Sequence, residues 1–226
     1  MKAARVLFGA LAAAAALCPY ARAAEEAGAG PPSLADSVQM RRAQIEKKVA
    51  MARSRIQHKN FVPARSAIDG ASDAVRALQD ELPPQRISSR LTAVERQIKN
   101  RDWGGARLAL EKALRELDAQ ARYIDVTKIW QHLDDARGFV ADRRGTLALQ
   151  EVQAAKRLAH IDDISSPLRR ALVYLSDARR ELLKLPTFFK SKRAAANRRL
   201  DAAEAELGRA YAEIEKLLAG EYATGG

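Results

Sequence analysis

An internal repeat of 42 residues is the feature that most constrains the fold of this chain. Residues 55–71 align without a gap with residues 97–113, and a further step of 42 residues gives a weaker copy in which Gly145 replaces an aromatic residue. The matched positions include an aromatic pair and an alanine pair, namely Phe61 with Trp103 and Ala64 with Ala106. Alanines at helical spacing let one helix lie close against the previous one, and the aromatic ring fills the gap at the turn. The repeat therefore predicts helical hairpins that stack or bundle to bury their apolar faces.

The rest of the chain also shows helical periodicity, and none of it alternates as a strand does. Apolar residues recur at steps of three and four over 34–56 and over 168–185. Helix boundaries are predicted at Pro83–Pro84, at Gly104–Gly105, at Ser166 followed by Pro167 in the first helical position, and at Pro186. We expect an all-α fold of about seven to eight helices, arranged as antiparallel helical hairpins in a bundle or a short solenoid.

The last predicted helix carries a heptad-like seam. Its members are Ala196, Leu200, Ala203, Leu207, Ala210, Ile214 and Leu217. Such a seam packs either between helices of one chain or between subunits, and the sequence leaves both alternatives open.

The N-terminal residues have the three parts of a secretory signal peptide. Lys2 and Arg5 precede the uncharged apolar run 6–17, and Ala21 and Ala23 are the small residues that a signal peptidase reads. The run is shorter than the about 20 apolar residues that span a bilayer. We expect cleavage after Ala23 and a periplasmic or secreted protein. The predicted organisation is a signal peptide over 1–23, a flexible Gly/Ala/Pro-rich arm over 24–32, a helical domain over 33–220 and a disordered tail over 221–226.

The charge balance is basic. The chain has a net charge of +11, and residues 1–23 hold three basic residues and no acid, so cleavage would leave +8. A basic surface favours acidic partners such as anionic lipid, polyanions or an acidic protein. Cleavage would also remove Cys18, the only cysteine, and with it any thiol nucleophile or cysteine-based metal site.

No pattern of catalytic or ligand-binding residues is visible. His58, His132 and His160 are not spaced for a shared metal, although His132 has Asp135 and His160 has Asp163 three residues on. The chain has no phosphate-binding glycine loop, nucleophile elbow or dinucleotide fingerprint. We therefore predict that the protein is not an enzyme, has no metal site and needs no cofactor.

A basic segment near the C-terminus is the sharpest positive feature. Six cations and no acid lie between residues 184 and 199, and Phe188 and Phe189 lie among them. The cations are Lys184, Lys190, Lys192, Arg193, Arg198 and Arg199. If the phenylalanines are exposed, the segment would suit an anionic membrane or polyanion. If they pack inward, the cations form a solvated helix face and a surface contact for a protein. Nucleic acid is not expected, because no base-reading motif appears and export removes that partner.

Two resemblances follow from the repeat. The strings over 59–64 and 101–106, with Ile68, Leu110 and the alanines that follow, resemble the second half of a tetratricopeptide repeat, although the period is longer and the Leu-Gly pair is missing. Over about Ile45 to Leu183 the chain is also similar to the YfdX family of exported helical proteins. That resemblance implies a bacterial periplasmic protein linked to stress tolerance, with no catalytic site to carry over.

These observations predict an exported helical protein that acts as a protein-interaction or stress-tolerance module without catalysis, through a protein partner or self-association. Binding to an anionic membrane or envelope polymer through residues 184–199 is one alternative. A small-ligand carrier with a pocket in a helical bundle is another.

Overall fold

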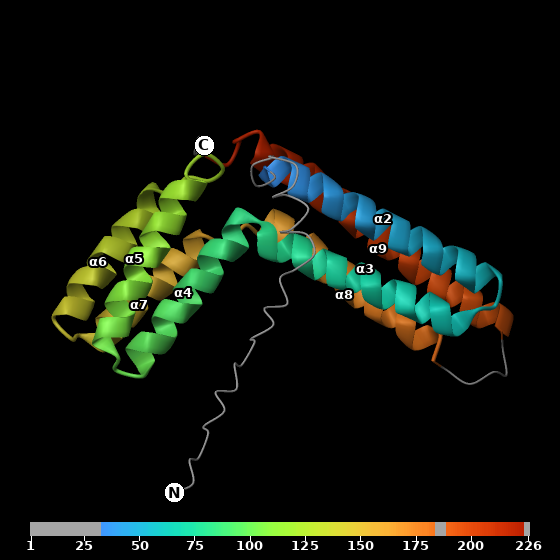
Figure 1. Ribbon diagram of the computed structural model, residues 1–226, viewed down its shortest axis with the longest axis horizontal. Helices are drawn as coiled ribbons and strands as arrows, with labels where there is room; N and C mark the ends of the chain where they lie inside the picture. Colours follow the sequence, from blue (N-terminus) through green and yellow to red (C-terminus); the bar gives the residue numbers. More distant parts are fainter. Residues whose placement is uncertain (1–32, 184–188, 224–226) are drawn as a thin grey trace, which may run out of the picture. The chain divides into compact units, whose positions relative to one another are not determined.

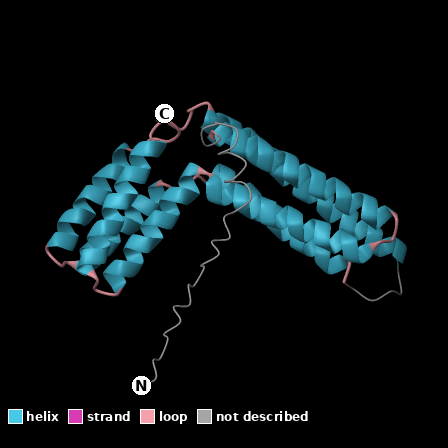
Figure 2. Cartoon of the chain, in the orientation of Figure 1, coloured by secondary structure: helices cyan, strands magenta, loops and turns pink. Residues whose placement is uncertain are grey.

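The computed structural model describes residues 33–183 and 189–223, with side chains of 189 and 190 left aside (Figure 1). The predicted signal peptide and arm, Lys184, Pro186 and Phe188 lie outside the described residues. Within the described ranges the chain forms eight helices and no strand, so the predicted all-α fold is confirmed (Figure 2). The helices are α2 (Leu34–Gln57), α3 (Phe61–Glu81), α4 (Pro83–Lys99), α5 (Trp103–Gln120), α6 (Thr127–Ala141), α7 (Gly145–Leu158), α8 (Asp162–Glu181) and α9 (Phe189–Leu218). None of them is both long and apolar enough to cross a membrane.

The helices form two four-helix bundles within one compact unit. In the first bundle, α2, α3, α8 and α9 contact one another in cyclic order. In the inserted bundle, α4, α5, α6 and α7 do the same, and the chain visits this bundle between α3 and α8 (Figure 1). In both bundles the first helix of one hairpin packs against the second helix of the other, so each bundle is a pseudo-symmetric pair of hairpins.

The turns of the first three hairpins are superimposable in their backbone description, which confirms the third copy of the repeat. Lys59, Arg101 and Arg143 follow one another at steps of 42 and have φ values of 62°, 57° and 58°. In the first turn the N–H of Asn60 donates to the carbonyl of Arg55, and the N–H of Lys59 donates to that of Ile56. The equivalent bonds join Asp102 to Gln97, Arg101 to Ile98, Arg144 to Phe139 and Arg143 to Val140. This is a Schellman motif, which satisfies the last carbonyls of the helix.

The missing aromatic of the third copy has a direct packing reason. A Cβ atom on Gly145 would lie 3.1 Å from Cη2 of Trp103 and 3.7 Å from Cγ2 of Ile98. The indole of the second copy therefore occupies the space that an aromatic side chain of the third copy would need. Phe61 and Trp103 are both half-buried and packed against the core, and Ala64 and Ala106 are fully buried, in line with the structural roles predicted from the repeat.

The hairpin of α8 and α9 is a fourth copy with a longer connection. Leu175 and Ala178 of α8 lie 42 residues after the buried Leu133 and Ala136 of α6. The buried positions of α9 lie instead 48 residues after their equivalents in α7, which pairs Ala148, Val152 and Ala155 with Ala196, Leu200 and Ala203. Six additional residues between the two helices hid this copy in the sequence.

The seam of α9 is buried within the chain. All seven of its members are at most 3 % exposed, because they face α8 and α2 in the first bundle. Of the two alternatives left by the sequence, the structure shows the one in which the seam packs between helices of one chain.

The predicted start of α8 at Ser166 and Pro167 is wrong. The helix begins at Asp162, and Pro167 lies inside it. Asp162 and Asp163 in the first turn favour the positive end of the helix dipole. The proline removes one intrahelical hydrogen bond, while its own ring and the side chain of Ile164 are buried in return.

Order also extends past the predicted domain end at residue 220. Glu221 to Ala223 form a turn, the phenol of Tyr222 donates a 2.7 Å hydrogen bond to Glu213, and the N–H of Asp125 donates a 2.7 Å bond to the carbonyl of Tyr222. These contacts tie the end of the first bundle to the loop between α5 and α6.

Candidate binding cleft

The predicted basic surface contact is only partly visible in the described residues. Arg198 is exposed, and Lys192 and Arg193 are half-buried. Arg199 lies 3.8 Å from the carboxylate of Asp177, and its guanidinium carbon is 6.0 Å from the centre of the Tyr174 ring. Lys184 and the side chain of Lys190 lie outside the described residues. The surface therefore remains a prediction, with one of its cations committed to α8.

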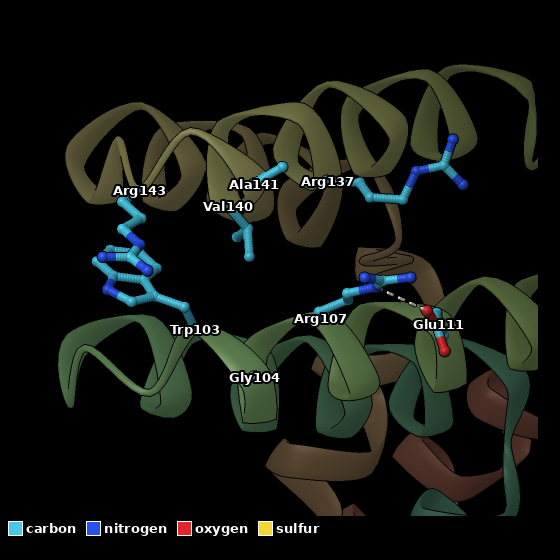
Figure 3. A pocket seen from close by; sticks show the side chains of 8 residues that line it. All are labelled: Trp103, Gly104, Arg107, Glu111, Arg137, Val140, Ala141 and Arg143. Atoms are coloured by element: carbon cyan, nitrogen blue, oxygen red, sulfur yellow. Dashed lines mark hydrogen bonds and ion pairs between the residues drawn. The ribbon is translucent and has the colours of Figure 1, made fainter.

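A different cationic feature is a cleft between α5 and α6 with a volume of about 570 Å³. Its lining residues are Trp103, Gly104, Arg107, Glu111, Arg137, Val140, Ala141 and Arg143 (Figure 3). Figure 3 shows Val140 reaching from α6 toward α5, with the Arg107–Glu111 pair marked along α5. The lining thus combines three guanidinium groups with one carboxylate and one indole.

The arginines of the cleft differ in their partners. Nε of Arg107 lies 3.3 Å from Oε1 of Glu111, four residues on in α5. Arg137 lies 2.6 Å from Oδ1 of Asp134, three residues back in α6. No carboxylate of residues 33–183 or 189–223 is recorded within ion-pair distance of Arg143. The cleft consequently carries a surplus of positive charge, greatest beside Trp103 and Arg143.

Two local features build the Trp103 end of the cleft. The carboxylate of Asp102 accepts a 2.9 Å hydrogen bond from the N–H of Gly105 and so caps α5. A Cβ atom on Gly105 would lie 2.2 Å from that carboxylate, whereas one on Gly104 would approach nothing closer than Asp102 Oδ1 at 3.9 Å. Gly105 therefore makes room for the cap, and Gly104 leaves the cleft open.

The sequence singled out Trp103 for a structural role but did not point to the arginines. Arg107, Arg137 and Arg143 come together only because α6 returns antiparallel to α5, a contact between two different hairpins. Periodicity along one helix carries no signal for that pairing. The matching of Arg107 with Arg65 in the repeat even argued for a general surface position.

The histidines lie near helix ends, as expected, but with different partners from those suggested by spacing. Nδ1 of His132 is 2.6 Å from Glu151 across the α6–α7 hairpin rather than paired with Asp135. Nε2 of His160 is 3.0 Å from Asp162 and 3.1 Å from the hydroxyl of Ser165, rather than paired with Asp163. Antiparallel packing brings Glu151 beside His132, and the earlier start of α8 brings Asp162 beside His160. His58 contacts the carbonyl of Ser54 at the end of α2.

No cluster of three or more histidine, cysteine or acidic side chains with the arrangement of a metal site occurs among the described residues. The cleft offers hydrogen-bond donors and an aromatic surface, which suit binding of an anion rather than bond-breaking chemistry.

Comparison with known proteins returned no match among protein-family models, curated proteins or solved structures.

Proposed function

We propose that this chain is an exported, non-catalytic interaction protein that binds an acidic partner protein through the cleft between α5 and α6. The observation that carries the proposal is the cleft lining, in which three arginines and a tryptophan face one carboxylate.

The distribution of apolar surface supports a polar mode of binding. The large apolar side chains exposed in the described part of the chain occur at most once per helix. They are Met51, Val62, Leu108, Trp130, Leu158, Val173 and Leu183. An apolar seam that could drive association through the hydrophobic effect is thus buried in the two bundles, and partner selection falls to charged groups at the surface.

The basic balance supports an acidic partner. A net charge of +8 after the predicted cleavage would attract an acidic protein over distances of about a Debye length, and the cleft would provide the contact. The resemblance to the YfdX family extends the proposal to a periplasmic role in stress tolerance.

The test measures binding of the purified chain to poly-L-glutamate at about 50 mM and about 300 mM salt. We expect replacement of Arg107, Arg137 and Arg143 by serine to weaken binding at least tenfold at the lower salt. A control of equal charge replaces the exposed Arg55, Arg76 and Arg169 of the first bundle by serine, and we expect a change of less than threefold. Equal losses in the two variants would show a general charge effect and overturn the role of the cleft.

Two further arms separate the alternatives. Replacing Lys190, Lys192, Arg193, Arg198 and Arg199 by serine tests the basic segment, and vesicles that contain phosphatidylglycerol replace poly-L-glutamate to test membrane binding. Strong vesicle binding that depends on these five cations and not on the cleft would favour the membrane alternative.

A further inference from the structure

The cleft has a length that suits a short peptide segment. Its α5 wall runs from Trp103 to Glu111, and its α6 wall from Arg137 to Ala141 with Arg143 beyond. At 1.5 Å per helical residue the α5 wall is about 12 Å long. An extended chain advances about 3.3 Å per residue, so about four residues would fill the cleft.

The charges within the cleft favour carboxylates at both of its ends. Arg143 is the cation beside Trp103 without a recorded carboxylate partner in the described ranges. At the other end Arg107 and Arg137 are paired only within their own helices, with Glu111 and Asp134. Exposed pairs at such spacing are weak, so a ligand carboxylate can replace either partner.

The apolar part of the cleft favours a peptide over a phosphate polymer. Trp103 is half-buried, since its ring packs on Gly145 on one side and lines the cleft on the other. Val140 and Ala141 continue this apolar surface, and the open space at Gly104 lies beside it. A bound carboxylate polymer or lipid headgroup would leave this surface uncovered, whereas an aromatic side chain between two acidic residues would cover it.

We infer that the cleft recognises a segment of about four residues in which an aromatic side chain is flanked by acidic ones. This inference rests on the proposed function and specifies the chemistry of its partner. The aromatic residue contacts Trp103 and Val140, and the flanking carboxylates contact Arg143 and Arg107.

The test uses two acetylated and amidated tetrapeptides, glutamate–phenylalanine–glutamate–glutamate and the same peptide with glycine in place of phenylalanine. Isothermal titration calorimetry with the full chain measures their dissociation constants. We expect the phenylalanine peptide to bind at least tenfold more tightly than the glycine peptide. Equal binding of the two peptides would overturn the inference and leave the proposed function standing.

A pair of glycine substitutions tests the location. Gly104→Met fills the cleft without changing its charge, and Gly138→Met adds the same side chain on α6 at a position with no neighbouring atom within 4 Å and outside the cleft lining. We expect Gly104→Met to weaken the phenylalanine peptide at least tenfold and Gly138→Met to leave it unchanged. Both variants replace a helical glycine in open space, so circular dichroism and thermal melts should show intact folds.

The outcomes separate the two levels of the proposal. Loss of poly-L-glutamate binding only in the arginine variant, with peptide binding unaffected by Gly104→Met, would overturn the inferred ligand but not the acidic partner. Absence of binding to both poly-L-glutamate and the phenylalanine peptide would overturn both.

Discussion

At the residue scale, the position after the first helix of each hairpin shows how this chain trades backbone strain against charge. Lys59, Arg101 and Arg143 hold the left-handed conformation that glycine adopts most easily. Each is a cation at a helix C-terminus, where the helix dipole favours positive charge. The dipole term of about 0.3–1 kcal/mol is similar to the conformational cost, so the three basic residues are tolerated without a net gain.

Substituting this position by glycine should relieve the strain. We expect Lys59→Gly to raise the free energy of unfolding by up to about 1 kcal/mol, measured by urea denaturation. The matched control is Lys47→Gly in the middle of α2, where glycine should cost about 1 kcal/mol. Destabilisation by both substitutions to the same extent would contradict the strain argument.

The adjacent glycines of α5 should respond in different ways to alanine. We expect Gly104→Ala to stabilise the protein by about 0.5–1 kcal/mol, because its Cβ meets open space and alanine favours the helix. In Gly105→Ala the Cβ displaces the Asp102 carboxylate, and loss of that cap of about 1 kcal/mol cancels the gain. Differential scanning calorimetry of the two variants checks the difference, which would vanish if the cap contributed nothing.

Two tyrosines of the first bundle form a similar contrast. The hydroxyl of Tyr211 is buried without a hydrogen-bond partner in the described structure, whereas that of Tyr222 donates to Glu213. We expect Tyr211→Phe to be neutral or to stabilise the protein slightly, and Tyr222→Phe to cost about 1 kcal/mol in chemical denaturation. A large loss in Tyr211→Phe would show that its hydroxyl is satisfied.

The same tyrosines predict how stability depends on alkaline pH. Burial raises the pKa of Tyr211, and burial together with Glu213 raises the pKa of Tyr222. Above the ordinary pKa near 10 the unfolded chain releases phenolic protons that the folded chain retains. The free energy of unfolding should therefore be unaffected by these groups below that pH and fall as pH rises above it. Tyr211→Phe should flatten this decline in urea titrations between about pH 9 and pH 11.

At the element scale, helix type and most boundaries were predictable because they are local. The repeat predicted the hairpins, the alanines at the close contacts and the aromatic plugs, and Pro83–Pro84 correctly separated α3 from α4. The start of α8 was not predictable from Ser166 and Pro167, because burial of Ile164 and the acidic first turn outweigh the preference of proline for a helix start. The fourth hairpin escaped notice because its two helices are in register with different periods.

The contact between Trp103 and Gly145 links two hairpins and should show coupling. We expect Gly145→Phe, which restores the aromatic of the repeat, to destabilise the protein by about 1–3 kcal/mol through overpacking. In a Trp103→Ala background the same change should cost less, because the ring that blocks it is gone. Thermal unfolding of the four proteins in this cycle measures the coupling, and simple additivity would contradict the packing explanation.

At the scale of the whole molecule, the cyclic closure of each bundle was not predictable. The sequence allowed an open stack or a bundle, and it allowed the α9 seam to join subunits. Closure depends on contacts between hairpins far apart in the chain, such as α2 with α9, where Arg53 bridges to Asp201 and Glu204. The cleft was hidden for the same reason, since α5 and α6 become neighbours only through closure of the inserted bundle.

Closure makes a prediction about assembly. Because the α9 seam is buried within one chain, we expect a monomer in size-exclusion chromatography with light scattering, at both low and high salt. Leu200→Ala should cost about 2–5 kcal/mol of folding stability and leave the protein monomeric. A dimer that dissociates on this substitution would contradict the internal assignment.

The chain leaves the first bundle at Leu82 and returns to it at Ile161, and these two residues line the same small cavity. Since the departure and return points are neighbours, the inserted bundle behaves as a cassette: a short loop from α3 to α8 could replace it while the surrounding helices keep their partners. Lineages that share the first bundle would then be free to exchange, lose or diversify the cassette that holds the cleft. Variation in binding specificity should accordingly concentrate between residues 83 and 158, while the frame evolves slowly around it.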